Sequence, residues 1–346
     1  MWVNSEQPNL DMWRHLKFLS FEENCKRLLK GEIKSNRKIY KIDDIALEKK
    51  SKQIAMCIKQ AGEYFYAAEQ VSINTSPLLF YYGMLSLAKA LIITNIEGLF
   101  LEQLAYHGLT TKANTGNHNK DSSLWKIEAE IAVVNDGVFK EFANIFNTVL
   151  ENKMIFKFKD LLSVDCENYQ IYERFYNESS RVLLIQNNNI NQNSGKHIQL
   201  TIHANSKEEV YKHIPEMEKD FSHIIQSQPP QMQFSGFSLN ELPEYIHIVR
   251  SNGFDYIIGS IDYELNGVIK KKCLNPIVTD YMIMYILSMC VRYKQDFWGD
   301  IIVGKQNGIL GLLQLYIPVI KRNFPNKILN YLFNEQFTFS TPTLWM

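Results

Sequence analysis

Apolar residues recur at steps of three and four through the first hundred positions, which is the spacing of a helix with one buried face. The densest stretch is 75–93, where Ser76 is the expected cap and Pro77 the first helical residue. Apolar side chains lie nearly all round this helix, so we place it at the centre of a bundle. Gly83 interrupts it at a cost of about 1 kcal/mol, which predicts a close approach by a neighbouring helix.

Further helices are predicted on both sides of this central one. Residues 22–29 and 45–70 keep the helical period, and the polar face of the longer segment, which includes Lys50, is predicted to be solvated. Residues 97–109 are expected to form a shorter helix that ends at Gly108 in a left-handed conformation.

The middle of the chain changes to alternating apolar and polar positions, which is typical of strands. A hairpin is expected at the turn 135–137, and a helix over 139–150. Residues 180–275 then predict a mostly antiparallel sheet that contains one helix, at 207–225. The strands expected in it are 181–186, 197–203, 232–237, 245–250, 254–261 and 267–272.

The last part of the chain is helical again. Segments 276–293, 309–321 and 326–334 fit helices, and Pro318 should kink or end the second of them. We expect 281–291 to pack against 78–92, so that helices from both ends of the chain form one body. The predicted fold is therefore α+β, a helical bundle with a mostly antiparallel sheet insertion. Its expected parts are 1–124, 125–275 and 276–346.

Composition narrows the class of protein. Lysine plus arginine equals aspartate plus glutamate at 37 each, so the chain lacks the global positive field of a dedicated nucleic-acid binder. Its five cysteines are dispersed without a CxxC pair, which supports neither a disulfide framework nor a zinc site. The polar start and the short apolar runs at 281–291 and 309–320 predict a cytoplasmic protein without a membrane span. No cofactor is expected.

Several catalytic motifs fail on inspection. Gly299 to Lys305 matches seven positions of a phosphate-binding loop, but the eighth is Gln306 and no strand precedes it. HExxH, GxGxxG and GxSxG are absent from the sequence, and no arginine is followed four to six residues later by histidine, as in helical HEPN ribonucleases.

Two clusters in the predicted sheet stay open as weaker alternatives. His197 and His203 share a face and could bind a metal with Glu244 or His247. A nuclease would use carboxylates beside lysines, and the candidates are Asp255, Asp262 and Glu264 with Lys270–Lys272. Such residues are also common on solvated sheet faces.

Three cationic or ionisable residues have unusual surroundings. Lys89 lies in the central apolar helix, where it either reaches the surface, pairs with a carboxylate or binds an anion. His107 is either a surface cap or a site residue at the end of the bundle. Arg292 is favoured at its helix end by the helix dipole, and either stacks on Tyr293 or Trp298, pairs with a carboxylate, or binds phosphate.

Four stretches together resemble a known family. They are IKQAGEYFYAAEQ (58–70), SPLLFYYGMLSLAKALI (76–92), YHGL (106–109) and ILSMCVRYKQDFW (286–298), and in this order they are similar to the YaaC-like family of bacterial cytosolic proteins. The resemblance implies no particular activity and does not cover the central sheet. It implies that six residues are family-pattern positions: Tyr81, Tyr82, Lys89, His107, Arg292 and Trp298.

Two functional hypotheses follow. The first is a non-catalytic interaction or assembly module, which binds a partner protein or another copy of itself in a bacterial stress or anti-phage system. The second is an enzyme or sensor that acts on a nucleotide or nucleic acid. It would bind the phosphate through Lys89, His107 and Arg292, with Tyr81 and Tyr82 lining the pocket. Under the second hypothesis these three side chains converge, and under the first they scatter or bond to carboxylates.

Overall fold

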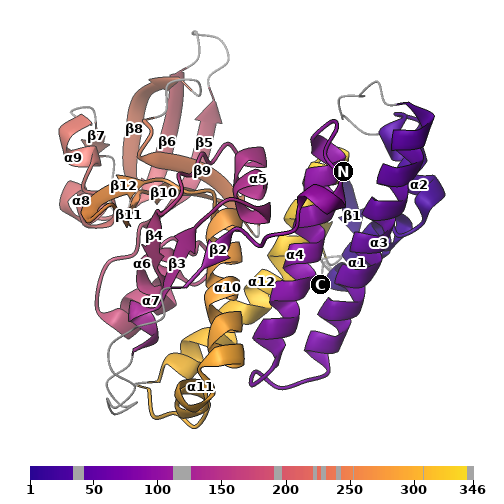
Figure 1. The fold of residues 1–346 in the computed structure, drawn as a ribbon. Coiled ribbons are helices and arrows are strands. Elements are labelled where there is room, and N and C mark those ends of the chain that lie inside the picture. The colour runs from indigo at the N-terminus through magenta and orange to yellow at the C-terminus, as the bar shows by residue number, and fades with distance from the viewer. Residues whose placement is uncertain are drawn as a thin grey trace. The chain divides into compact units, whose positions relative to one another are not determined.

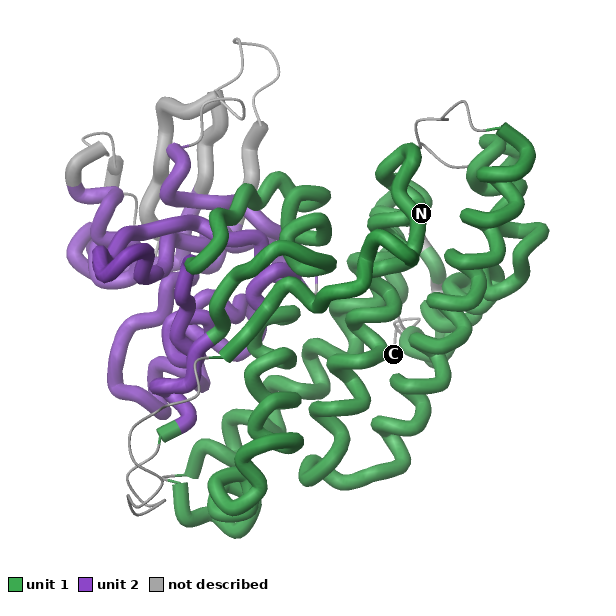
Figure 2. The backbone as a smooth tube through the Cα atoms, in the orientation of Figure 1, with its two compact units in different colours: residues 1–126, 132–153, 280–346 green, residues 127–131, 154–279 purple. Residues whose placement is uncertain are grey.

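The computed structural model describes residues 1–33, 43–111, 126–190, 197–220, 224–226, 231–238, 243–251, 253–306 and 308–340. The predicted polar loop over 112–125 lies outside these residues. Of the asparagine-rich connection at 187–195, the structure describes only the backbone of 187–190. The chain folds into two compact units (Figure 2), the first made of 1–126, 132–153 and 280–346, the second of 127–131 and 154–279. The α+β class is confirmed.

Helices from both ends of the chain build the first unit (Figure 1). They are α1 (Pro8–Phe18), α2 (Glu22–Leu29), α3 (Asp44–Glu69), α4 (Ser76–Asn95), α5 (Val138–Ile145), the part of α10 (Pro276–Tyr293) from Asp280 onwards, α11 (Gln295–Ile302) and α12 (Ile309–Phe333). Asp43 caps α3 by accepting a hydrogen bond of 2.8 Å from the backbone N–H of Ala46. At α4 the prediction was wrong by one residue, because Thr75 is the N-cap and makes no side-chain bond.

The long helices α3 and α4 approach each other closely at Gly83, as predicted. A Cβ added to this glycine would lie 2.5 and 2.7 Å from two ring carbons of Phe65 on α3. No side chain larger than hydrogen fits at that distance, so the packing gain of the pair outweighs the poor helix propensity of glycine. By length and apolarity alone α4 could cross a membrane, but 78% of its apolar window is buried inside the protein, as in a core helix. A cytoplasmic location stays a prediction.

Lys50 of α3 is buried, with 1% of its surface exposed, so its prediction on a solvated face was wrong. Its Nζ donates hydrogen bonds of 2.9, 2.8 and 2.9 Å to the backbone carbonyls of Ile93, Ile96 and Leu99. Those carbonyls lie at and just beyond the end of α4, where a helix leaves acceptors unpaired and where a cation is favoured by the helix dipole. The ammonium therefore closes the C-terminus of α4.

The C-terminal helices pack on the N-terminal ones within this unit, as the sequence predicted for 281–291 and 78–92. The ring of Tyr81 on α4 meets those of Tyr281 and Tyr285 on α10, with centroids 5.6 and 5.5 Å apart. Phe142 of α5 and Phe324 of α12 also lie against the Tyr281 ring, at 5.3 and 6.4 Å. An aromatic cluster thus joins four helices.

Three local predictions in the first unit were wrong. Segments 309–321 and 326–334 are one helix, α12, and not two, because its buried apolar stripe on both sides of Pro318 and Pro325 outweighs the lost backbone bonds. A kink at Pro318 stays a prediction. The expected helix over 97–109 is reduced to a 3₁₀ turn at Leu101–Gln103. The expected hairpin at 135–137 is instead the connection from β3 (Ile131–Val134) to α5.

The two ends of the described chain are joined. Strand β1 (Trp2–Asn4) pairs in parallel with β13 (Thr338–Ser340), in the register Trp2 with Thr338. The backbone N–H of Thr338 also donates a bond of 3.0 Å to the carbonyl of Met1.

The second unit contains a six-stranded antiparallel sheet in the order β7-β8-β6-β5-β10-β9. The strands are β5 (Val182–Ile190), β6 (His197–His203), β7 (Ile224–Gln226), β8 (Gln231–Ser238), β9 (Ile246–Ser251) and β10 (Phe254–Gly259). In the same unit β11 (Ile261–Leu265) pairs with β12 (Val268–Lys272) and β4 (Ile155–Lys157), and two helices, α6 (Phe158–Leu162) and α7 (Tyr169–Tyr176), precede β5.

The predicted helix over 207–225 is broken in the structure. It becomes α8 (Lys207–His213), α9 (Met217–Asp220) and the strand β7. Pro215 explains the break, because the residue before a proline is pushed out of the helical region. Apolar side chains of the two short helices, Val210, Ile214 and Met217, complete the core of the six-stranded sheet.

Candidate functional site

His107 is held by a backbone contact between its loop and the start of α5. The carbonyl of His107 accepts a bond of 3.1 Å from the N–H of Phe139, and Tyr106 accepts one of 2.9 Å from Val138. A Cβ on Gly108 would lie 2.8 Å from the backbone nitrogen of Phe139, and Gly108 has a φ of +83°. Glycine is needed there for both reasons, but it does not end a helix as predicted.

A row of contacts runs from His107 through two tyrosines to Arg292. The hydroxyl of Tyr81 lies 3.1 Å from Nδ1 of His107, and the two rings stack with centroids 6.0 Å apart. Next along the row, Tyr82 accepts a hydrogen bond of 2.9 Å from the guanidinium of Arg292, which also lies 5.6 Å over the Tyr82 ring. The guanidinium lies 5.0 Å over Tyr293 as well, so the predicted stacking on that ring is present.

Lys89 lies two helical turns after Tyr82 on α4 and is half-buried. Burial raises the pKa of the Cys57 thiol to about 11, and the charge of Lys89 opposes that rise. Burial lowers the pKa of His107, and the same charge lowers it further. Within the part of the chain that the structure describes, Lys89 makes neither a hydrogen bond nor an ion pair. The predicted pairing with a carboxylate is therefore not seen among these residues.

Electrostatics links the three ionisable groups. Loss of hydration lowers the pKa of His107, and the positive charges of Lys89 and Arg292 lower it further. A carboxylate would raise this pKa, and none of the described residues contributes one. The low pKa favours the neutral imidazole. We name Lys89, His107, Arg292, Tyr81 and Tyr82 the cation–tyrosine cluster.

Two buried polar atoms next to the cluster lack partners in the described chain. Nε of Arg292 makes no hydrogen bond, although its terminal nitrogens bond Tyr82 and the sulfur of Met289. Burial raises the pKa of Tyr81, and the nearby hydroxyl of Tyr281 adds to this, but that hydroxyl makes no well-formed hydrogen bond to a described residue. Leaving a buried donor unpaired is costly, so both atoms are positions at which the described chain leaves hydrogen bonding incomplete.

Trp298 lies apart from this row of contacts. It is buried, and its indole N–H donates a bond of 3.0 Å to the carbonyl of Asn74. That bond joins α11 to the connection before α4. Trp298 therefore has a structural role and is not part of the predicted anion pocket.

The whole sequence was compared with known protein families. The sequence matches the family described as YaaC-like protein over residues 17–332. The chain belongs to the YaaC-like family. The match confirms the predicted resemblance, and it extends that resemblance through the central sheet, where the sequence motifs did not reach. Comparison with curated proteins and with solved structures gave no significant match.

The second unit of this YaaC-like chain holds a polar network that the sequence analysis missed. Ser180 is fully buried and donates a bond of 2.6 Å to Glu173, whose carboxylate lies 3.3 Å from Nδ1 of His213. The three residue types are those of a hydrolase triad. Here, however, serine and glutamate contact the same ring nitrogen, so the histidine does not relay between them. The network joins α7, the connection before β5 and α8.

The metal and nuclease alternatives do not find support in the second unit. Asp255 forms two bonds of 2.7 and 2.8 Å with Arg250, which fixes it as a surface ion pair. Nδ1 of His203 lies 2.6 Å from the amide nitrogen of Gln186. Among the described residues no group of three or more histidines, cysteines or carboxylates could hold a metal ion. The side chain of His197 falls outside the description.

The near-match to a phosphate-binding loop is also explained. Gly299 lies inside α11, which ends at Ile302, so the segment is helical where such a loop would wrap a phosphate.

Proposed function

We propose that this YaaC-like chain is a nucleotide-binding sensor whose anion site is the cation–tyrosine cluster. One observation carries the proposal: Lys89 and Arg292 act on His107 with positive charge, and within the described ranges no carboxylate contributes to the pKa of that histidine. Lys89 and Arg292 are both half-buried, and a nearby negative charge stabilises positive charges that have lost part of their hydration. An uncompensated cluster of this kind suits a ligand that brings the negative charge with it.

Phosphate is the anion that the residue types favour. Arginine presents a planar fork of donors that matches phosphate oxygens, and lysine adds a point charge. Nε of Arg292 is free of hydrogen bonds among the described residues, so an acceptor on a ligand would complete its set. The Tyr293 ring adjoins the guanidinium and is 68% exposed, so it offers a stacking surface to a base, whereas the Tyr82 ring already contacts Tyr64 and Arg292.

Calorimetric titration with ATP, ADP and pyrophosphate tests the proposal. We expect binding of at least one of them, and a loss of affinity of tenfold or more in Lys89→Met and in Arg292→Lys, which keeps the charge but loses the fork. Lys52→Met is the matched control, because Lys52 is an exposed lysine of α3 outside the cluster. At a concentration 100 times the dissociation constant, the ligand should stabilise the fold by about 2.7 kcal/mol.

Two outcomes would contradict the proposal. The first is the absence of binding by all three compounds. The second is an equal effect of Lys89→Met and Lys52→Met, which would mean that any binding depends on surface charge alone.

A second candidate is the non-catalytic interaction or assembly module, and one observation favours it. Strand β12 is the terminal strand of its sheet and exposes Val268 and Ile269, at 55% and 67%. Exposed edge strands can pair with a strand of a partner. Lys270–Lys272 follow directly and oppose uncontrolled pairing. Light scattering of the wild type and of Ile269→Lys tests this candidate, since assembly through β12 should be lost in the variant.

A further inference from the structure

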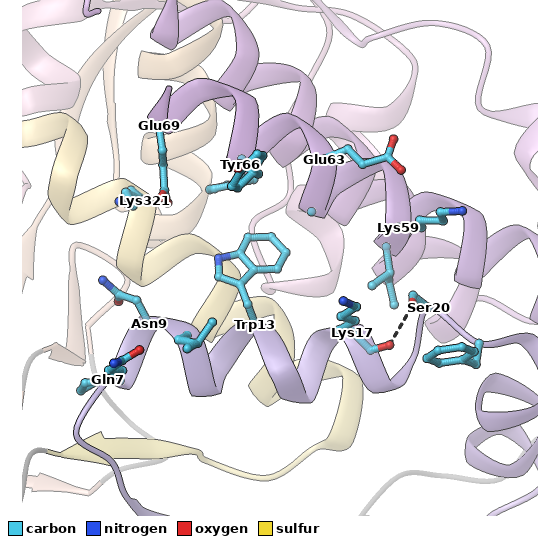
Figure 3. Close-up of a pocket in the computed structure, with 16 residues that line it drawn as sticks. Gln7, Asn9, Trp13, Lys17, Ser20, Lys59, Glu63, Tyr66, Glu69 and Lys321 are labelled. Atoms are coloured by element: carbon cyan, nitrogen blue, oxygen red, sulfur yellow. Dashed lines mark hydrogen bonds and ion pairs between the residues drawn. The ribbon is translucent and has the colours of Figure 1, made fainter. Parts of the chain in front are cut away.

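A groove lies between α1 and α3 in the first unit, away from the cation–tyrosine cluster (Figure 3). Its volume is about 1030 Å³, which is large enough for a small-molecule ligand. The lining is mainly apolar and aromatic, from Leu10, Trp13, Phe21, Ile58, Phe65 and Tyr66. Three of these, Leu10, Phe21 and Tyr66, are exposed at 45%, 60% and 69%. Large exposed apolar side chains gathered in one concave place mark a binding surface.

The two ends of the groove differ in charge. Figure 3 shows three polar residues at one end: Lys17 on α1, Ser20 just after α1, and Lys59 on α3. Within the described chain neither lysine ammonium has a hydrogen bond or an ion pair. At the other end Lys321 is neutralised by Glu69, with Nζ 2.9 Å from the carboxylate.

Glu63 also lines the groove, one turn after Lys59, and forms no ion pair with a described residue. In Figure 3 its carboxylate and the ammonium of Lys59 both point away from Trp13. Two unpaired lysines and one unpaired glutamate leave an excess of one positive charge along the groove. The complement is therefore an apolar body with a single negative charge at one end.

We infer that the groove binds a long-chain carboxylate, with its alkyl chain along Trp13 and Tyr66 and its head group between Lys17 and Lys59. The alkyl chain covers the exposed apolar side chains, which removes their surface from water. A monoanionic head matches the net charge of the groove, and a lysine pair binds a carboxylate without the planar fork that an arginine would supply. This inference does not depend on the nucleotide site.

The test is calorimetric titration of the full chain with dodecanoate below its micellar concentration. We expect binding that is at least tenfold tighter than that of dodecanol or dodecyltrimethylammonium, which have the same chain without the negative charge. Lys17→Glu and Lys59→Glu should each weaken dodecanoate binding by tenfold or more. Lys52→Glu, on the same helix but outside the groove, should leave it unchanged.

A filling variant tests the position of the alkyl chain. A Cβ at Gly62 would lie 3.8 Å from the Trp13 ring, in ordinary contact, so Gly62→Leu extends into the groove. Its binding of dodecanoate should be lost while its unfolding temperature stays near that of the wild type. If it fails to fold, the two charge reversals still decide the question. Lys89→Met should bind dodecanoate normally, so failure of this inference and failure of the nucleotide site are distinguishable.

Other occupants give different results. Equal binding of all three twelve-carbon compounds would overturn the charge argument. Tighter binding of dodecyl phosphate than of dodecanoate would overturn the carboxylate assignment. Dimers in light scattering that disappear in Gly62→Leu would show a second copy of the chain in the groove, and would also overturn the inference.

Discussion

Arg292 donates a hydrogen bond of 2.9 Å to the hydroxyl of Tyr82, which lies 210 residues earlier in the chain. The same guanidinium covers the Tyr82 ring at 5.6 Å, so one side chain contacts both the polar end and the face of its partner. The contact joins α10 to α4 and gives Arg292 a fixed orientation. Its remaining unpaired donor, Nε, is therefore held in place before any ligand arrives.

Tyr82→Phe removes the hydroxyl and keeps the ring. We expect a loss of about 1 kcal/mol in the free energy of unfolding, as for a typical hydrogen bond, measured by urea denaturation. Tyr64→Phe is the control, because the Tyr64 ring stacks on Tyr82 at 5.6 Å and its hydroxyl has no hydrogen bond to a described residue. Equal losses in the two variants would show that the bond to Arg292 contributes nothing.

Gly83→Ala should destabilise the protein although alanine is the better helix former. The new methyl group would lie 2.5 Å from the Phe65 ring, so α3 and α4 must move apart or the ring must turn. Gly311→Ala in α12 has nothing within 4 Å of the new methyl group and should stabilise by up to about 1 kcal/mol. Opposite signs in thermal unfolding are expected, and a gain at both sites would refute the close approach.

Lys50→Met should cost about 3 kcal/mol, because the carbonyls of Ile93, Ile96 and Leu99 each lose the hydrogen bond from the ammonium. The Ile96 carbonyl keeps a weaker bond of 3.4 Å from the backbone N–H of Leu99. Methionine keeps the length and apolar stem of lysine, so the loss reports the ammonium. Lys52→Met, an exposed neighbour, should change stability by less than about 0.5 kcal/mol. The measurement is urea denaturation at pH 7.

The pH dependence of Lys50 follows from its burial, which lowers the pKa of its ammonium from 10.5 to about 8. Between these values the unfolded chain binds more protons than the folded one, so stability rises with pH through this window. The difference between wild type and Lys50→Met should therefore grow from pH 8 to pH 10. A difference that shrinks would mean that the three carbonyls retain the proton more strongly than burial removes it.

Lys89→Met should raise the pKa of His107, because it removes one of the two positive charges that lower it. Proton NMR of the histidine ring across pH 5 to 8 measures the shift. Pyrophosphate added to the wild type should move the same pKa upward, since an anion at the cluster favours the imidazolium. If the pKa of His107 is unchanged in both experiments, then neither Lys89 nor pyrophosphate acts on this histidine, and the prediction is wrong.

The sequence predicted those elements whose signal is local. Helix α3 and the strands β5 and β6 follow from periodicity, and Gly83 signalled the close helix pair because a glycine in a buried helix needs a packing reason. The role of Lys50 could not be predicted. Its acceptors are backbone carbonyls that become available only where another helix ends. In the sequence pattern Lys50 looks the same as the exposed lysines around it, so the pattern does not indicate that contact.

The residues of the candidate site could be predicted from the sequence, but their contacts could not. Lys89 and Arg292 stand out because charge is unexpected in apolar helices, and residue type alone therefore selects them. Their arrangement depends on contacts that no periodicity encodes, such as the bond from Arg292 to Tyr82. The network of Glu173, Ser180 and His213 was missed because each residue looks ordinary in its own segment.

The parallel pairing of β1 with β13 has a consequence for biosynthesis. The ribosome releases β1 first, and its hydrogen-bonding partner is not made until almost all of the chain described here has been translated. The opening residues must therefore wait without their strand partner while the helices behind them assemble. A bulky group placed next to β1 would lie beside β13, the last of the described strands to be translated, and should slow their pairing more than the same group in a surface loop.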